Sequence, residues 1–446
     1  MEGGASNSCL KKSRIWHPNT QMAEWKKFCT IRSARGVWLT DTNGNKMIDA
    51  VASMWCNVWG HSERRLVTAM TSQAKKLQHS SLFNLTNRPA EELADRLVGI
   101  SPGMNSVFFS DNGSSAMEVA VKMAIQYCKN TNQKRTKIAA LKNGYHGDTF
   151  GAMSVGYIPE FFSRFQRQLF PVVRLSVPDK YRPPRGMTPQ DHTEYCLDKM
   201  EERLGRGDIA ALVMESGAQV AGGALLYPEG FERSAGRICK RHGVLLVLDE
   251  IATGFGRLGP MIQYARQKCS PDIVAYGKML TGGYLTMAAT LATKKVYDAF
   301  LGEFDEHLHL FHGHTYTGNP IAAAVANTNL RMYKERNLIN RIKKTSLVFE
   351  QFYDELLALN MVGDVRHRGM LMGIELVSDK RKKTPVTMEK SINSIIFEEG
   401  RKNGIYLRTL GNIVLLVPPL AITEEELEML LNRTVRTIKT LKTRIM

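Results

Sequence analysis

Short, almost entirely apolar stretches recur along the middle of the chain, and segments with helical periodicity separate them. The stretches are "SVFFS" (106–110), "KIAAL" (137–141), "ALVMES" (211–216), "VLLVLDE" (244–250) and "DIVAYGK" (272–278). Strands that are covered on both faces are apolar throughout, and their alternation with helices is typical of a mostly parallel α/β sheet. We therefore predict a large α/β domain, to which "TMAATLAT" (286–293) adds an antiparallel strand because its connection is short.

The pattern changes near residue 327, where short strands begin to alternate with helices. These strands are "GMLMGIEL" (369–376), "GIYLRTL" (404–410) and "IVLLVPP" (413–419). The mixture predicts a smaller α+β domain over 327–446, beside a large sheet domain over 66–326. Residues 1–65 carry strand-like pieces with an Asn-Gly turn signal, and we expect this N-terminal segment to pack with the small domain.

The composition, 43% hydrophobic and 23% charged, is that of a water-soluble globular protein. No apolar run approaches the roughly 20 residues that cross a bilayer. The opening stretch "MEGGASNSCLKKSRIWHP" lacks the apolar core of a secretory signal. The seven cysteines form no C-x-x-C pair, which indicates neither a zinc site nor a disulfide framework. We expect a cytoplasmic protein with no metal site and no membrane contact.

The formal net charge of +17 raises the possibility of nucleic-acid binding. The basic residues are dispersed, however, and the densest clusters, "KRTK" (134–137) and "DKRKKT" (379–384), are short and lack interleaved aromatics. We interpret both clusters as solvated loops. A general attraction for anionic substrates explains the charge equally well, so we expect no nucleic-acid partner, and a basic binding protein on a degenerate enzyme scaffold remains the alternative class.

Lys278 ends the apolar strand of "PDIVAYGKMLTGGY" (271–284), and the paired glycines Gly282 and Gly283 follow it. Lysine is rarely buried without a partner, so the simpler interpretation is that the strand ends there and the ammonium reaches water. The alternative is a lysine in a dry pocket, whose lowered pKa makes it a nucleophile toward a carbonyl carbon. Other motifs of the chain distinguish these two interpretations of Lys278.

Asp249 ends another strand that is too apolar to face water, and a buried carboxylate needs a partner. That partner is either a cationic ring nitrogen or a neighbouring arginine such as Arg257. The stretch "GFGRLG" (254–259) matches G-x-G-x-x-G, but it neither follows the strand directly nor opens a helix, which disfavours a dinucleotide site. Asp249 and Lys278 close consecutive strands, so a parallel sheet places both at the crevice where α/β sheets bind ligands.

Two further motifs supply binding groups. Gly113 and Ser114 stand between a strand and a helix, where free backbone N–H groups bind anions, although serine is also a common helix cap. Tyr145 lies between glycines in "NGYHGDTFGAMS" (143–154), where an aromatic ring can stack on a planar ligand or merely fill a turn. His146 beside it is more typical of a hydrogen-bonded structural histidine than of a metal ligand. Together with the lysine and the aspartate, these groups fit pyridoxal 5'-phosphate (PLP).

The chain resembles the class III aminotransferases, which are fold-type I PLP enzymes with a large sheet domain and a smaller α+β domain. The resemblance rests on the five stretches "IWHPNTQM", "NGYHGDTFGAMS", "LDEIATGFGR", "GHTYTGNP" and "YLRTLG", which span most of the chain. Within the family it is most similar to the biotin-pathway branch, which converts 8-amino-7-oxononanoate to 7,8-diaminononanoate with S-adenosylmethionine or lysine as the amino donor. A class III ω-aminotransferase acting on a different amine is the alternative.

The resemblance implies a role for each matching position, and a homodimer with shared active sites. It implies that Lys278 carries the cofactor and moves the proton, that Asp249 pairs with the pyridine nitrogen, and that Tyr145 stacks on the ring and lines the substrate pocket. The remaining implied residues are Gly113, Ser114, Gln219, His314 and the partner subunit's Thr315 for the cofactor, and Met54, Trp55, Gly313 and Arg408 for the substrate, with Arg408 on its carboxylate.

Four places depart from the members that use S-adenosylmethionine. They are Asn19 where those members carry tyrosine, Met54 and Trp55 where they carry two tryptophans, His314 where they carry proline, and Leu410 where they carry an aromatic residue. An aromatic cage suits a sulfonium cation, and this chain keeps only part of one. These positions look more like the branch that uses lysine, so the resemblance indicates the amino acceptor more firmly than the donor.

Overall fold

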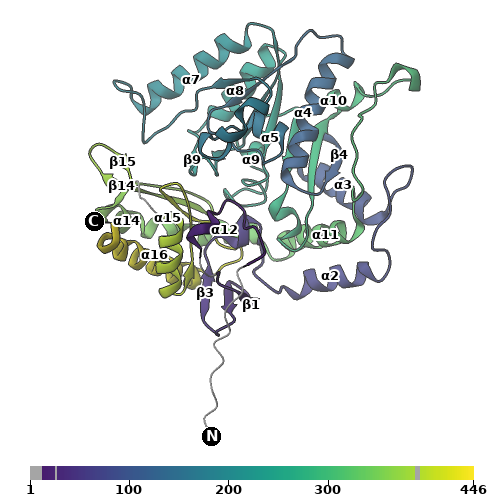
Figure 1. The fold of residues 1–446 in the computed structure, drawn as a ribbon. Helices are drawn as coiled ribbons and strands as arrows, with labels where there is room; N and C mark the ends of the chain where they lie inside the picture. The colour runs from purple at the N-terminus through teal and green to yellow at the C-terminus, as the bar shows by residue number, and fades with distance from the viewer. Residues whose placement is uncertain (1–12, 26–27, 387–391, 446) are drawn as a thin grey trace.

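A seven-stranded sheet forms the centre of the larger part of the molecule (Figure 1) in the computed structural model, which describes residues 13–25, 28–386 and 392–445. The strand order is β4-β12-β11-β10-β7-β5-β6, and β12 alone runs against the others. The strands are β4 (Met104–Ser110), β5 (Lys137–Leu141), β6 (Val172–Leu175), β7 (Ile209–Glu215), β10 (Leu245–Asp249), β11 (Ile273–Tyr276) and β12 (Ala288–Thr293). The predicted mostly parallel α/β sheet is confirmed, and so is the antiparallel return of β12.

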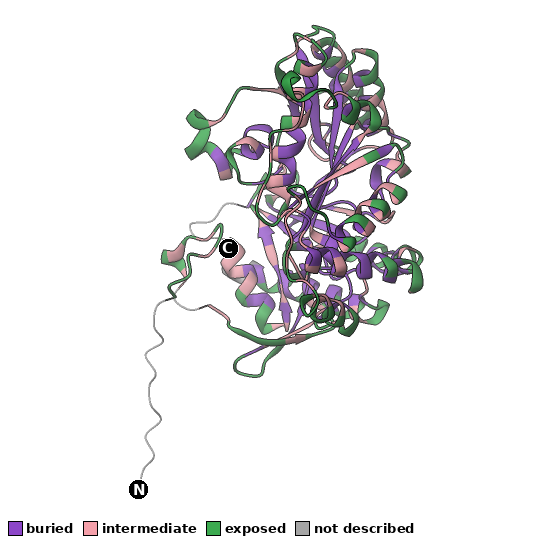
Figure 2. Ribbon diagram, turned by 90° about the vertical axis from the view of Figure 1, so that its right-hand side faces the viewer, coloured by how far each residue is buried: buried purple, intermediate pink, exposed green. Residues whose placement is uncertain are grey.

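Every residue of β7 and β10 is buried, which is why these strands read as continuous apolar runs. Figure 2 shows the sheet strands buried beneath helices whose outer faces are exposed. The longer helices around this sheet are α3 (Arg88–Ile100), α4 (Gly113–Asn130), α7 (Pro189–Leu204), α8 (Phe231–Arg241) and α11 (Pro320–Glu335). The shorter elements are α5 (Phe150–Val155), α6 (Pro159–Phe162), η2 (Ser163–Gln168), α9 (Gln263–Arg266), η3 (Lys278–Thr281), α10 (Lys294–Asp298), η4 (Phe304–Glu306) and the hairpin of β8 (Ala218–Gln219) and β9 (Leu225–Leu226).

The C-terminal part holds a second sheet, ordered β13-β14-β18-β17, with β15 paired to β14. Its strands are β13 (Val362–Arg368), β14 (Leu371–Asp379), β15 (Thr384–Pro385), β17 (Arg408–Leu410) and β18 (Ile413–Leu416). Its helices are α12 (Leu338–Thr345), α13 (Leu347–Gln351), α14 (Tyr353–Ala358), α15 (Ile392–Lys402) and α16 (Glu424–Ile445). The predicted boundary between residues 326 and 327 falls inside α11, so one continuous helix links the two parts.

The N-terminal segment pairs with the C-terminal part through a shared sheet. Strands β1 (Ile31–Arg35), β2 (Trp38–Asp41) and β3 (Lys46–Asp49) are joined by β16 (Ile405–Tyr406), which runs parallel to β3. The other N-terminal elements are η1 (Met22–Glu24), α1 (Ala52–Trp55) and α2 (Arg64–Ala74). Residues 1–12, 26 and 27 of the predicted 1–65 segment lie outside the described residues. No helix in the described ranges is long and apolar enough to cross a bilayer.

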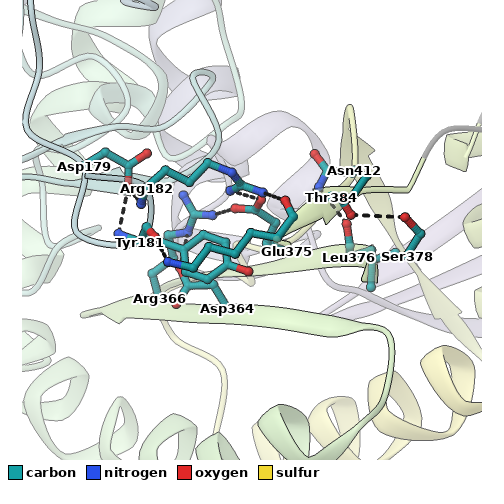
Figure 3. A network of polar contacts seen from close by, with 11 residues as sticks. Asp179, Tyr181, Arg182, Asp364, Arg366, Glu375, Leu376, Ser378, Thr384 and Asn412 are labelled. Carbon is teal, nitrogen blue, oxygen red and sulfur yellow. Dashed lines mark hydrogen bonds and ion pairs between the residues drawn. The ribbon is translucent and has the colours of Figure 1, made fainter. Parts of the chain in front are cut away.

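A buried charge network joins the loop after β6 to the second sheet (Figure 3). Arg182 and Arg366 both donate to the carboxylate of Glu375, whose side chain is only 4% exposed. Arg182 also donates to the backbone carbonyl of Lys383 at 2.6 Å. Lys383 in turn donates to the carbonyl of Tyr181, so this lysine of the predicted solvated loop over 379–384 has a protein partner, while Lys380, Arg381 and Lys382 are exposed to solvent.

Candidate functional site

A cavity of about 650 Å³ lies where strands β7, β10 and β11 end. This is the edge of a parallel sheet at which ligands of α/β folds bind. The predicted residues that line it are Met54, Trp55, Gly113, Ser114, Tyr145, Asp249 and Lys278. The fold therefore gathers, around one cavity, side chains that are spread over more than 200 positions of the sequence.

Lys278 follows the end of β11 with a left-handed φ of 42°, which turns the chain sharply at the cavity. Its Nζ lies 5.3 Å from the ring centroid of Trp55. Burial disfavours the ammonium form and lowers the pKa of Lys278, while the nearby carboxylates of Asp249 and Glu215 act in the opposite direction. A lysine with a lowered pKa has a larger neutral, nucleophilic fraction at neutral pH.

Asp249 is buried at the end of β10 and has two partners. Its Oδ2 lies 2.8 Å from Nδ1 of His146, and its Oδ1 accepts a hydrogen bond from the N–H of Ile251 at 2.9 Å. The suggestion that Arg257 neutralises this carboxylate is wrong, because Nη1 of Arg257 donates instead to the carbonyls of Met370 (2.9 Å) and Pro418 (2.8 Å). His146 is buried and hydrogen-bonded, as its sequence context predicted.

Glu215 is a second buried carboxylate on the cavity wall, and sequence reasoning did not select it. It ends β7 and accepts hydrogen bonds from the N–H groups of Tyr145 (3.1 Å) and Val220 (3.0 Å). Burial, reinforced by the neighbouring Asp249, raises the pKa of Glu215 to about 8. The signal was present in "ALVMES", whose glutamate ends a strand at the same edge of the sheet as Asp249.

The start of α4 presents free backbone N–H groups beside the cavity and could serve as a cradle for an anion. The Asn112 side chain caps the helix by accepting from the N–H of Ser115 at 3.0 Å, and the N–H groups of Gly113 and Ser114 find no hydrogen-bond partner among the described residues. A Cβ at Gly113 would come within 2.9 Å of Ile251, and one at Gly147 would come within 2.0 Å of the Ser114 hydroxyl. This bare backbone at the N-terminus of an 18-residue helix fits a phosphate group.

Tyr145 stands over the cavity in the loop after β5. Its ring stacks near that of Phe162, with centroids 6.2 Å apart and planes inclined by 16°. Its hydroxyl donates to Oδ2 of Asp148 at 3.0 Å. Burial and the Asp148 carboxylate raise the pKa of this phenol, so it remains protonated throughout the physiological range. The ring is therefore held in place by Phe162, which stacks near it, and by Asp148 at its hydroxyl group.

Arg408 lies at the edge of the cavity, in contact with Met54, which lines the cavity together with Trp55. Nη1 of Arg408, the first residue of β17, lies 3.4 Å from Sδ of Met54. Arg408 is not on the cavity wall itself, but Met54 and Trp55 are. The backbone here is strained, because Ala52 (φ 47°) and Trp55 (φ 65°) adopt left-handed conformations that cost about 1 kcal/mol or more each outside glycine.

Five predicted site residues do not line this cavity, and Arg408 is one of them. Gln219 is fully buried, and its Nε2 donates to the carbonyl of Lys142 at 2.9 Å. The other three follow one another in the loop before α11; they are Gly313, His314 and Thr315. His314 contacts the carbonyl of Phe109 (3.1 Å) through Nε2, and Thr315 is exposed to solvent. Their predicted roles stay predictions.

Comparison with known proteins relates this arrangement to one family. The family model described as aminotransferase class III matches residues 21–438. A Geobacter sulfurreducens protein named adenosylmethionine-8-amino-7-oxononanoate aminotransferase is 41% identical, over 96% of both chains. The crystal structure of the protein of that name from Methanocaldococcus jannaschii superposes with a TM-score of 0.90 at 40% identity, over 96% of this chain and 97% of that one. An ω-transaminase from Pseudomonas jessenii, solved in complex with PMP, superposes with a TM-score of 0.91 at 27% identity, over 97% of both chains.

Proposed function

The chain belongs to the class III aminotransferases, and we propose that within this family it transfers an amino group to 8-amino-7-oxononanoate, forming 7,8-diaminononanoate in biotin biosynthesis. The observation that carries the proposal is the similarity of about 40% over nearly the whole chain to several proteins named for that reaction. The geometry supports it, because the cavity combines an amine of lowered pKa, a buried carboxylate and an anion cradle.

Class III aminotransferases use PLP, and the cavity fits this cofactor. When bound, PLP supplies an electron sink that stabilises negative charge on the carbon next to the nitrogen. Lys278 would hold the aldehyde carbon and then, once released, carry the proton between the donor's α-carbon and the aldehyde carbon, which the transferred nitrogen separates. Asp249 would hold the ring nitrogen in its protonated form, with His146 fixing the carboxylate. The cradle of Gly113 and Ser114 would hold the phosphate.

The mouth of the cavity suits a keto acid with a carboxylate at its far end. A guanidinium offers two parallel N–H donors to a carboxylate, which gives both energy and orientation. Arg408 lies beside Met54, which lines the cavity, so an extended substrate could reach Arg408 while its carbonyl lies near Lys278. Tyr145 would cover the reacting carbon and exclude water from it.

We leave the amino donor as a choice between two cations. The curated relatives are named for adenosylmethionine, whereas the pocket of this chain has Met54 in place of an aromatic residue. A smaller aromatic surface stabilises a sulfonium less. Lysine, whose charge is a primary ammonium, is therefore the second candidate for the amino donor.

A homodimer in the cytoplasm completes the proposal. Exposed apolar side chains surround the loop that carries Gly313 and Thr315; they are Phe83, Leu85, Phe311 and Tyr316. Thr315 does not line the cavity of its own chain. In a homodimer it could instead reach the cofactor phosphate bound by the partner subunit. The free thiols of Cys56, Cys128, Cys196, Cys239 and Cys269 suit a reducing compartment. Light scattering of the purified protein would test the dimer.

The decisive experiment follows the visible absorbance of the purified protein after PLP is added. S-adenosylmethionine and L-lysine are then supplied separately, and 8-amino-7-oxononanoate last, with the diamine measured by mass spectrometry. A band that fades with one donor, followed by diamine formation, supports the proposal and names the donor. A band that responds only to other amines, without diamine, supports the ω-aminotransferase alternative. If no band forms at all, the proposal is wrong.

A further inference from the structure

Asp49, the last residue of β3, is completely buried although no lysine or arginine pairs with it among the described residues. Its carboxylate instead accepts three hydrogen bonds. Oδ1 accepts from the N–H of Val51 at 3.2 Å, and Oδ2 accepts from the N–H of Ser53 at 2.7 Å. Nε2 of His61 lies 3.0 Å from the same Oδ2. A buried charge without these donors would be very unfavourable, so the three bonds define the position of the carboxylate.

The segment that these bonds hold has a backbone that side chains other than glycine rarely adopt. Ala52, Ser53 and Trp55 all have positive φ angles, and Ser53 combines φ 61° with ψ −78°, close to the rare γ-turn with positive φ. Such conformations persist only where the surroundings over-determine them, and they concentrate at functional sites. Here the surroundings are the Asp49 carboxylate and two backbone bonds, from Ala50 to the carbonyl of Tyr406 and from Val417 to the carbonyl of Ala50.

The strained segment carries two side chains of the cavity wall, one near Lys278 and the other in contact with Arg408. Trp55 places its ring 5.3 Å from Nζ of Lys278, and Met54 places its sulfur 3.4 Å from Nη1 of Arg408. A relaxed backbone would move both side chains together, because they are adjacent in the sequence.

We propose that Asp49 is a positioning residue for the substrate, which acts by holding residues 51–55 in the strained conformation that places Trp55 beside Lys278 and Met54 against Arg408. The inference rests on the proposed function, because it assumes a substrate that reaches from the lysine to the arginine. The carboxylate itself does not line the cavity, so its effect is transmitted through Met54 and Trp55.

The test compares Asp49→Asn with Asp41→Asn. Asp41 is a matched control, because it is a buried aspartate of the same sheet whose carboxylate also accepts three N–H donors, one from Asn43 and two from Asn45. Asp49→Asn should raise KM for the keto acid about tenfold, the equivalent of one charge-assisted hydrogen bond, while kcat and the visible band of the bound cofactor change little. Asp41→Asn should lower the melting temperature and leave KM unchanged.

Equal KM changes in the two variants, or none in Asp49→Asn, would overturn the proposal. Should Asp49→Asn not fold, His61→Ala removes one donor while keeping the carboxylate, and about a threefold rise in KM is expected; an unchanged KM would then overturn the proposal.

Hydrogen exchange separates this inference from the proposed function. The amides of Val51 and Ser53 should exchange faster in Asp49→Asn, and not in Asp41→Asn, whatever the reaction is. If the wild-type protein binds no PLP, the proposed function fails, but hydrogen exchange still tests the role of Asp49. Unchanged exchange at Val51 and Ser53 in Asp49→Asn would refute that role.

Discussion

Glu215 and Asp249 are register partners at the carboxyl ends of the adjacent parallel strands β7 and β10. Two buried carboxyl groups so close together favour one shared negative charge over two. His146 contacts Asp249, whereas Glu215 accepts hydrogen bonds from two backbone N–H groups. Glu215 therefore retains a proton near neutral pH, since burial, reinforced by the neighbouring Asp249, raises its pKa to about 8.

The proton retained by Glu215 predicts a pH-dependent stability for the cofactor-free protein. Between pH 4.5 and about 8 the folded state keeps a proton on Glu215 that the unfolded state has lost, so the free energy of unfolding falls as pH rises through this window. Glu215→Gln should reduce that slope by one proton, about 1.4 kcal/mol per pH unit. Urea unfolding at several pH values measures the slope. The exposed Glu160, changed to Gln, is the control, and equal slopes in both variants would contradict the assignment.

Lys278→Ala should abolish the visible band of the cofactor-bound protein and lower kcat at least about 100-fold, because both the covalent anchor and the proton carrier are lost. Absorbance after gel filtration and a single-turnover assay measure the two effects. Lys294→Ala removes an exposed lysine that pairs only with Asp298, and it should change neither quantity. A band that survives in Lys278→Ala would remove the lysine from the mechanism.

Gly147→Ala should weaken PLP binding at least about tenfold, since the added Cβ would lie 2.0 Å from the Ser114 hydroxyl and displace the first turn of α4. Gly186→Ala is a matched control. Gly186 has a similar positive φ of 86°, but nothing lies within 4 Å of an added Cβ. The control should lose only about 1 kcal/mol of stability from backbone strain. Fluorescence titration with PLP distinguishes the two, and equal affinities would argue against the cradle.

Arg408→Ala should raise KM for the keto acid about 100-fold while leaving the cofactor band unchanged, because it removes a bidentate charged contact outside the cofactor site. Arg408→Lys keeps the charge but lacks the planar guanidinium, so its KM should lie between those of the wild type and Arg408→Ala. Initial rates at varied keto acid measure KM, and absorbance measures the cofactor. If the band and KM were disturbed together, Arg408 would belong to the cofactor site.

The sequence was most informative where one local pattern carries the chemistry. Apolar runs ending in Asp249 and Lys278 predicted both the parallel sheet and the crevice, because the ends of parallel strands must meet. The start of α4 at Gly113 was equally readable, as the turn and the helix lie next to each other in the chain.

Side-chain pairing across the fold could not be read in this way. Arg257 is the nearer cation to Asp249 along the chain, yet the buried turn at 254–259 aims it at the carbonyls of Met370 and Pro418. His146, more than a hundred residues from Asp249, is the partner. The strained backbone at Ser53 was likewise invisible, because it depends on a buried carboxylate and not on the residue itself.

The antiparallel strand β12 also determines when the site can form during synthesis. The strand β4, which leads into α4, joins the sheet through β12, a contact between segments about 180 residues apart in the chain. A ribosome-bound chain that ends between Lys278 and Ala288 has both Asp249 and Lys278 but lacks the strand that joins β4 to the sheet. We therefore expect a chain truncated before β12 to bind PLP poorly.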